Sequence, residues 1–143
     1  MNNFTIFYTD DDEDDLSIFA DAVDSLSKEV NLQMFSGGEK LLNTIHNSSQ
    51  KPDVLFLDLN MPGKNGFDVL KELKGSTENS DIPVVIFSTS NEPSIIEKCL
   101  VLGANFFITK PVFMKDIVKA IEFVLSINWQ EFVPDRKTFV YKN

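Results

Sequence analysis

Five short, strongly apolar segments recur along the chain, and longer amphipathic segments separate them. The apolar segments are residues 4–8, 31–35, 54–57, 83–87 and 106–109. Several of them are continuous apolar runs rather than alternations of apolar and polar residues, which is typical of strands that are buried on both faces. The pattern therefore predicts five strands in a sheet that is covered on both sides.

The segments that follow the apolar runs have helical periodicity. Apolar residues recur there at steps of three and four, in stripes at residues 16–26, 41–45, 67–73, 95–100 and 113–125. Gly103 directly follows the fourth stripe, where a glycine commonly ends a helix. Strands that alternate with helices predict an α/β domain with a parallel sheet and helices on both of its faces.

The chain length of 143 residues suits one domain. We place this domain at residues 1–127, and residues 128–143 fall outside the strand–helix pattern. The latter residues, called the C-terminal segment below, carry four aromatic side chains: Trp129, Phe132, Phe139 and Tyr141. Such a segment is expected to pack on the domain or to form a contact between subunits.

The composition excludes several functional classes. The net charge of −9 argues against direct binding of nucleic acid or of an anionic membrane surface, because both rely on Lys and Arg. The single cysteine, Cys99, cannot form an internal disulfide. No signal peptide is visible, and no apolar run approaches the roughly 18 residues that span a bilayer. A cytoplasmic location is the expectation.

Polar residues with a shared chemistry follow four of the predicted strands. Asp10 and Asp11 follow the first strand, Asp58 the third, Ser88 the fourth and Lys110 the fifth. Because ligands of open α/β sheets bind at the carboxyl ends of the strands, these side chains are expected to share one pocket. Three carboxylates there call for a cation, and oxygen ligands suit Mg²⁺. A hydroxyl and a lysine would hold phosphoryl oxygens, so the set fits phosphoryl transfer to an aspartate.

These motifs resemble the receiver domains of bacterial two-component response regulators, over residues 4–125. The resemblance rests on the acidic pair, on Asp58 in the segment FLDLNMP, on Gly66, on Ser88 and on the Lys110-Pro111 pair. It implies a flavodoxin-like doubly wound (βα)5 fold with strand order 2-1-3-4-5. The acidic run at residues 10–15, the long loop at residues 75–81 and the C-terminal segment are similar to the stand-alone subgroup that includes partners of bacterial phytochromes.

The resemblance also implies a role for each site residue. Asp58 is the phosphoacceptor, and Asp10, Asp11, Asp58 and the backbone carbonyl of Asn60 hold Mg²⁺. Ser88 and Lys110 bind phosphoryl oxygens. Phe107 stands at the switch aromatic of the family, and the Lys110-Pro111 bond is expected to be cis. Thr89, Ser90 and Pro111 flank the pocket, and Asn60 and Ser90 are expected to tune the lifetime of the acyl phosphate.

The implied function is that of a single-domain response regulator. A sensor histidine kinase or a histidine phosphotransfer protein would donate the phosphoryl group. The face formed by helix four, strand five and helix five would then change and bind a downstream protein, pass on the phosphoryl group or form a homodimer. Phosphotransfer and dephosphorylation would be self-catalysed, so the protein is not expected to be an enzyme that turns over a metabolite.

Three other interpretations fit less well. A haloacid dehalogenase-type hydrolase needs a second aspartate two residues after its nucleophile, and Asn60 stands there. A degenerate receiver that acts only as an interaction module would not need the complete set of site residues. A calcium-binding loop requires a glycine where Asp15 stands. The acids at residues 12–15 are expected mainly to favour the start of helix one.

Overall fold

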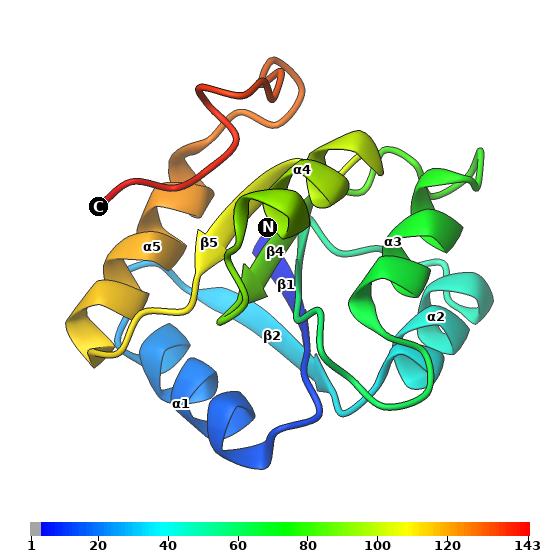
Figure 1. Cartoon of the computed structure of the whole chain (residues 1–143). Coiled ribbons are helices and arrows are strands. Elements are labelled where there is room, and N and C mark those ends of the chain that lie inside the picture. The colour runs from blue at the N-terminus through cyan, green and yellow to red at the C-terminus, as the bar shows by residue number, and fades with distance from the viewer. Residues whose placement is uncertain (1–3) are drawn as a thin grey trace.

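The computed structural model describes residues 4–143, in which five parallel strands alternate with five helices (Figure 1). The strands are β1 (Phe4–Thr9), β2 (Val30–Phe35), β3 (Val54–Leu57), β4 (Val84–Ser88) and β5 (Phe106–Thr109). The helices are α1 (Glu13–Asp24), α2 (Gly38–Asn47), α3 (Gly66–Lys74), α4 (Pro93–Val101) and α5 (Met114–Ser126). The predicted α/β architecture is confirmed.

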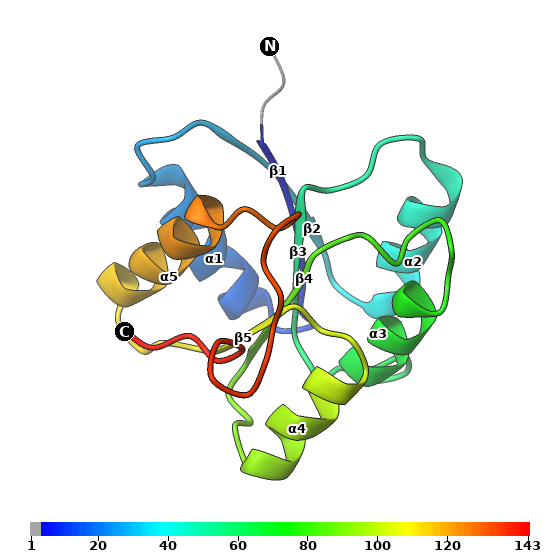
Figure 2. The same cartoon turned by 90° about the horizontal axis from the view of Figure 1, so that it is seen from above.

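The sheet has the predicted strand order β2-β1-β3-β4-β5. Two apolar cores lie on its two faces: α1 and α5 cover one, and α2, α3 and α4 cover the other (Figure 2). β3 and β4 are buried along their whole length, which agrees with their continuous apolar sequences. The strand order reverses between β1 and β3, so the carboxyl ends of these strands are the expected place for a ligand.

The ends of the elements differ from the sequence pattern in a few places. β4 begins at Val84 because Pro83 has no N–H group to donate to the sheet, and it extends to Ser88. Phe113 does not belong to the apolar stripe of α5: it is the N-cap residue and is 64% exposed. Gly103 has φ of +100° just after α4, as predicted for a glycine that ends a helix. No helix within residues 4–143 is long and apolar enough to cross a membrane.

The C-terminal segment lies along the free edge of β5, between α5 and α4 (Figure 2). The Phe107 amide donates to the Phe139 carbonyl at 2.9 Å, and the Tyr141 amide donates to the Phe107 carbonyl at 2.8 Å. The Phe139 side chain is 1% exposed and joins the core beneath α2–α4. The rings of Trp129, Phe132 and Tyr141 surround Phe106 on the opposite face.

Candidate functional site

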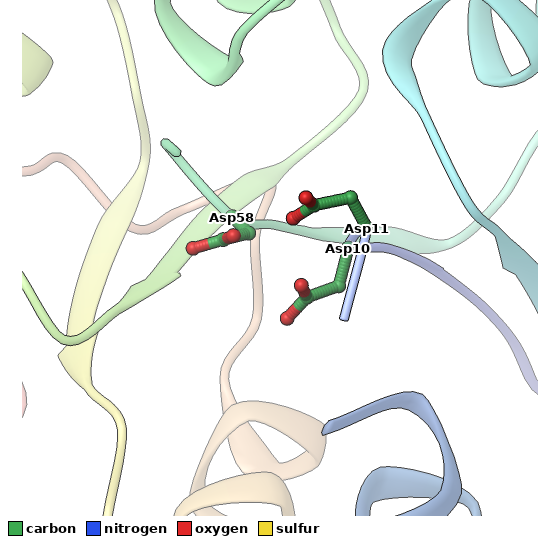
Figure 3. Close-up of side chains that lie close together, drawn as sticks. All are labelled: Asp10, Asp11 and Asp58. Carbon is green, nitrogen blue, oxygen red and sulfur yellow. The ribbon is translucent and has the colours of Figure 1, made fainter. Parts of the chain in front are cut away.

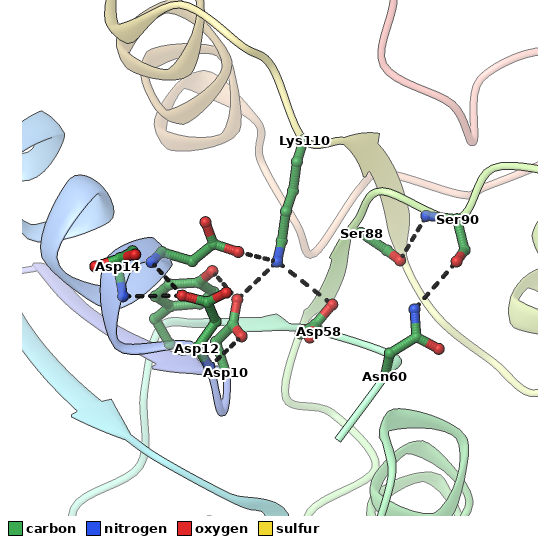
Figure 4. Close-up of polar contacts among 10 residues, drawn as sticks. Asp10, Asp12, Asp14, Asp58, Asn60, Ser88, Ser90 and Lys110 are labelled. Carbon is green, nitrogen blue, oxygen red and sulfur yellow. Dashed lines mark hydrogen bonds and ion pairs between the residues drawn. The ribbon is translucent and has the colours of Figure 1, made fainter. Parts of the chain in front are cut away.

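The polar residues singled out in the sequence converge at the carboxyl edge of the sheet (Figure 4). Asp10 directly follows β1, Asp58 follows β3, Ser88 ends β4 and Lys110 follows β5. Parallel strands bring these positions together although the chain separates them widely. The structure thus unites the residues that the sequence pattern assigned to one pocket.

Three carboxylates form a compact acidic cluster at this edge. One oxygen from each of Asp10, Asp11 and Asp58 lies within 4.8 Å of the others (Figure 3). Asp10 is fully buried, Asp58 is 5% exposed, and Asp11 is exposed to solvent. Like charges at such distances repel one another unless a cation is bound. A set of carboxylate oxygens fits a hard cation such as Mg²⁺.

The carboxylate of Asp10 already accepts three hydrogen bonds from the protein. Its Oδ2 accepts from the Tyr8 hydroxyl at 2.5 Å and from Lys110 Nζ at 2.7 Å, and its Oδ1 accepts from the Asp12 amide at 3.0 Å. The Asp11 side chain makes no hydrogen bond or ion pair with any of residues 4–143. Asp11 is therefore better placed than Asp10 to bind a metal ion directly.

Lys110 joins the acidic cluster to helix α1. Its Nζ lies 2.7 Å from Asp10 Oδ2, 2.8 Å from Asp15 Oδ2 and 3.5 Å from Asp58 Oδ1. Burial opposes the charge on Lys110, but the hydrogen bonds that it donates to Asp10 and Asp15 and the field of Asp58 outweigh burial and raise the pKa of the ammonium. Lys110 therefore carries a positive charge at any physiological pH, directly beside Asp58.

The carboxylate of Asp58 sits in an environment that disfavours its charge. Burial raises the pKa of Asp58 to about 6, although Lys110 lowers it, and repulsion from Asp10 adds to the increase. The Asp58 amide donates to the Thr9 carbonyl at 3.0 Å, which fixes the residue to the end of β1. A carboxylate with this raised pKa gains from a nearby cation, because the cation favours the ionised form.

Hydroxyl and amide groups line the other side of Asp58. Ser88 is fully buried, and its Oγ accepts from the Ser90 amide at 3.1 Å. Asn60 Nδ2 donates to Ser90 Oγ at 3.1 Å, which links the loop after β3 to the loop after β4. Thr89 is exposed between them. These groups lie where the sequence placed them, and their roles toward a phosphoryl group stay predictions.

Two further predictions concern β5 and the loop after it. Phe107, the residue at the family's switch position, is fully buried and lies 6.2 Å from Phe139 between ring centroids. The resemblance predicts a cis Lys110-Pro111 bond. This prediction is wrong, because residues 4–143 contain no cis peptide bond. The trans isomer of an X–Pro bond is favoured by roughly 0.5–1 kcal/mol even without help from its surroundings.

Gly66 lets helix α3 begin directly against the site. A Cβ atom at this position would lie 2.3 Å from the Asp58 carbonyl oxygen and 2.7 Å from Leu59 Cα. The Gly66 amide donates to the Leu59 carbonyl at 3.0 Å. Glycine is therefore required for the close approach of α3 to the residues that follow β3.

Tyr8 and Asp15 belong to the site, and sequence reasoning missed both. Tyr8 stands two residues before Asp10, so both side chains point to the same face of the strand, which is a signal that the sequence contains. Asp15 was assigned only to the start of α1. Its contact with Lys110 spans 95 residues of sequence, and no local pattern predicts such a pair.

The comparison with protein families identifies the class of this protein. The family described as the response regulator receiver domain matches residues 6–122, which is most of the chain. The chain therefore belongs to the receiver domain family of two-component response regulators, which are signalling modules. The resemblance stated from the sequence is confirmed.

The particular relatives are response regulators from plants and bacteria. The two-component response regulator ORR4 of Oryza sativa subsp. indica is 46% identical over 79 residues, which cover 50% of this chain and 34% of that protein. The chain thus spans about a third of that relative's length. The phosphorylated cyanobacterial phytochrome response regulator RcpA has a TM-score of 0.81 and 24% identity, and the match covers 93% of this chain and 98% of that one.

A second solved structure is the Mn²⁺-bound form of the response regulator Rcp1. It has a TM-score of 0.77 and 26% identity, and the match covers 92% of this chain and 97% of that one. RcpA and Rcp1 are similar to this chain along nearly its whole length. This agrees with the subgroup that the sequence indicated.

Proposed function

We propose that this protein is a phosphorylation-controlled switch in which Asp58 accepts a phosphoryl group from a histidine kinase or a histidine phosphotransfer protein. The observation that carries the proposal is the position of Asp58: it is nearly buried between an acidic cluster and the ammonium group of Lys110. This arrangement has an anionic nucleophile, a set of oxygen ligands and a cationic partner within a few ångströms, which is the requirement of phosphoryl transfer.

The oxygen ligands fit Mg²⁺. Asp11 and Asp58 would bind it through carboxylate oxygens and Asn60 through its backbone carbonyl. Asp10, which is held by Tyr8 and Lys110, would orient the cluster. When bound, the ion neutralises charge on the phosphoryl oxygens. The Mn²⁺-bound form of Rcp1, 26% identical to this chain, supports a divalent cation in this family.

The transfer itself needs few groups from the protein. An Asp58 oxygen forms a bond to phosphorus while the bond from phosphorus to the donor's imidazole nitrogen breaks. That nitrogen leaves with the electron pair of the broken bond. The Ser88 hydroxyl donates to one phosphoryl oxygen and Lys110 pairs with another. Later hydrolysis of the acyl phosphate resets the switch, so the protein turns over no separate metabolite.

The phosphodonor is expected to dock between α1 and the loop that follows β5. Exposed apolar side chains gather there: Ile18 is 41% exposed, Val112 88% and Phe113 64%. Ile18 and Val112 also line a small cavity together with Lys110. Apolar side chains beside a charged pocket are a typical partner-binding surface. A histidine side chain presented there would lie near Lys110, which is 3.5 Å from Asp58.

Phosphorylation would act on the face formed by α4, β5 and α5. The acyl phosphate adds roughly two negative charges and strong hydrogen-bond acceptors, which draw Ser88 and Lys110 toward Asp58. Because Ser88 ends β4 and Lys110 follows β5, their movement shifts an equilibrium between two arrangements of this face. Phe107 would report the shift. The output is binding of a downstream protein, transfer of the phosphoryl group to another histidine, or homodimerisation through the same face.

Intact-mass measurement tests the proposal directly. The wild-type protein incubated with acetyl phosphate and Mg²⁺ is expected to gain about 80 Da, the mass of one phosphoryl group. Asp58→Ala is expected to gain nothing. Asp14→Ala, which removes an exposed aspartate of α1 that makes no side-chain contact with the site, is the matched control and should behave as wild type. The absence of an adduct on wild type, or an equal adduct on Asp58→Ala, would contradict the proposal.

A further inference from the structure

Lys110 lies nearer to a carboxylate of α1 than to Asp58. Lys110 Nζ lies 2.8 Å from Asp15 Oδ2. Its distance to Asp58 Oδ1 is 3.5 Å, which is long for a hydrogen bond (Figure 4). An ammonium group has three donors, and Lys110 uses two of them on Asp10 and Asp15. Lys110 therefore lies beside Asp58 but makes its short hydrogen bonds to Asp10 and Asp15.

The Asp15 side chain makes no capping hydrogen bond in its own helix. The Asp12 side chain caps α1 by accepting from the amides of Asp14 and Asp15 at 2.9 and 3.2 Å. The side-chain carboxylate of Asp15 makes one polar contact within residues 4–143, the contact with Lys110. Its interaction is thus directed at the site rather than at the helix.

The two carboxylates that hold Lys110 differ in how easily they release it. The side chain of Asp10 is fully buried and also bound by the Tyr8 hydroxyl and the Asp12 amide, so it has no alternative to its present position. The side chain of Asp15 is 34% exposed, and water can replace the ammonium there. Exchange of partners by Lys110 is therefore easier at Asp15 than at Asp10.

We propose that Asp15 is a positioning residue that competes with the phosphoryl group for Lys110, and so weakens the phosphorylated state relative to the resting one. The proposal rests on the proposed function of Asp58. In the resting protein Asp15 holds the ammonium group. A phosphoryl group on Asp58 carries more charge than a carboxylate and takes Lys110 from Asp15. The loss of the contact between Lys110 and Asp15 then offsets part of the free energy gained when Lys110 binds the phosphoryl group.

Binding of beryllium trifluoride, an anion with the shape and charge distribution of a phosphoryl group, measures this competition without any turnover. We would titrate it in saturating Mg²⁺ and observe bound fluoride by ¹⁹F NMR. Asp15→Asn should bind the anion about two- to fivefold more tightly than wild type, the range typical of a partly exposed ion pair. Asp15→Glu keeps the competing charge and should bind as wild type does.

Two controls separate the proposed competition from a general effect of charge. Asp14→Asn removes an equal charge one residue away on α1, outside contact with Lys110, and should change the affinity less than Asp15→Asn does. In a Lys110→Ala background, Asp15→Asn should give no additional gain, because the competition needs the lysine. Thermal unfolding of each variant confirms that it is folded, and Asp15→Ser replaces Asp15→Asn if the latter is not.

The outcomes distinguish this inference from the proposed function. Unchanged or weaker binding by Asp15→Asn overturns the competition, as does an equal gain in the Lys110→Ala background or in Asp14→Asn. In each of these cases wild type still binds the anion and Asp58 remains the acceptor. If wild type binds no beryllium trifluoride in Mg²⁺ at all, both the acceptor role of Asp58 and the competition fail.

Discussion

The charge on Asp58 opposes folding in the absence of a metal ion. Its pKa is about 6 in the folded protein against 3.8 as the ordinary value, because burial and Asp10 disfavour the ionised form. The folded state therefore binds more protons than the unfolded state between these pH values, and the free energy of unfolding falls as pH rises through about 6. The favourable contribution of the protonated form is complete only below about pH 4.

Asp58→Asn removes this dependence. In EDTA at pH 7 the variant should be more stable than wild type by about 1–3 kcal/mol, because it has no buried charge. At pH 4 the two proteins should differ little. Urea unfolding between pH 4 and 8 measures the difference, with Asp14→Asn as the control for loss of an exposed charge. A difference that stays constant across this range would contradict the assignment of the raised pKa to Asp58.

The buried Tyr8 hydroxyl donates a hydrogen bond to Asp10 and so stabilises the acidic cluster. Burial raises the pKa of its hydroxyl, and so does the hydrogen bond with Asp10, so the hydroxyl keeps its proton and donates at all working pH values. Tyr8→Phe leaves the buried Asp10 carboxylate with one donor fewer and should lower the free energy of unfolding by about 1–3 kcal/mol. Tyr141→Phe is the control, because the Tyr141 hydroxyl makes no hydrogen bond within residues 4–143. Equal losses in urea unfolding would count against the role of Tyr8.

At the residue scale the sequence predicts which groups meet but not how they pair. Asp10, Asp58, Ser88 and Lys110 were predictable because the carboxyl ends of parallel strands converge. The pairing of Lys110 with Asp15 was not, because it depends on the direction of one side chain on the first turn of α1. Hydrophobic periodicity places that turn but carries no information on side-chain contacts.

At the scale of elements, Lys74 connects α3 to the loops that lead into β4 and β5. Its Nζ donates to the carbonyls of Ser80 and Ile82 at 3.0 and 2.9 Å and to Asn105 Oδ1 at 3.0 Å. Burial lowers the pKa of Lys74 to about 8. The ammonium therefore satisfies three acceptors at once at neutral pH, and no local sequence pattern predicts these contacts.

Lys74→Met keeps the length of the side chain but removes all three donors. The Ser80 and Ile82 carbonyls lose this donor, while Asn105 Oδ1 keeps the Val84 amide at 2.9 Å. The free energy of unfolding at pH 7 should therefore fall by about 2–4 kcal/mol. Lys71→Met, at an exposed position of the same helix, is the control and should lie within about 0.5 kcal/mol of wild type. Urea unfolding measures both. A loss in Lys74→Met no greater than in Lys71→Met would show that the three contacts contribute little.

The elements themselves were largely predictable, since all five strands and five helices lie at the segments that the periodicity indicated. Their ends were less so. Phe113 continues the apolar stripe of α5 in sequence, yet it stands at the N-cap position and is exposed to solvent. Capping and the path of the preceding loop determine where a helix begins. The hydrophobic pattern carries no information on either.

At the scale of the whole molecule, the two edges of the sheet are treated differently. β2 forms one edge, and each of its residues is partly buried or exposed. β5 forms the other edge of the sheet. The C-terminal segment covers it through hydrogen bonds with both the amide and the carbonyl group of Phe107. An uncovered edge strand is a template for pairing with another chain. The order of the strands was predictable from the family resemblance. The path of the C-terminal segment was not predictable from periodicity or from a motif, because its aromatic residues follow no regular spacing.

Phe139 anchors this segment, so its removal should free the edge of β5 without unfolding the domain. Phe139→Ala leaves a cavity beside Phe107, and the loss of a buried Phe costs about 3–5 kcal/mol where the surroundings cannot relax. Because the segment lies at the edge of the sheet, it can instead detach by local opening. Hydrogen exchange followed by NMR should then show faster exchange of the Phe107 and Tyr141 amides, which depend on the segment, while the Ile6 amide in β1 stays protected.

Val133→Ala is the matched control, because Val133 is 78% exposed in the same segment and should leave all three amides unchanged. Slow exchange of Phe107 in Phe139→Ala would mean that the aromatic cluster around Phe106 holds the segment without the anchor. Faster exchange of Ile6 together with Phe107 would mean that the C-terminal segment is an integral part of the domain's core. Only selective loss of protection at β5 identifies it as a separable cover over the edge that carries the predicted switch residue.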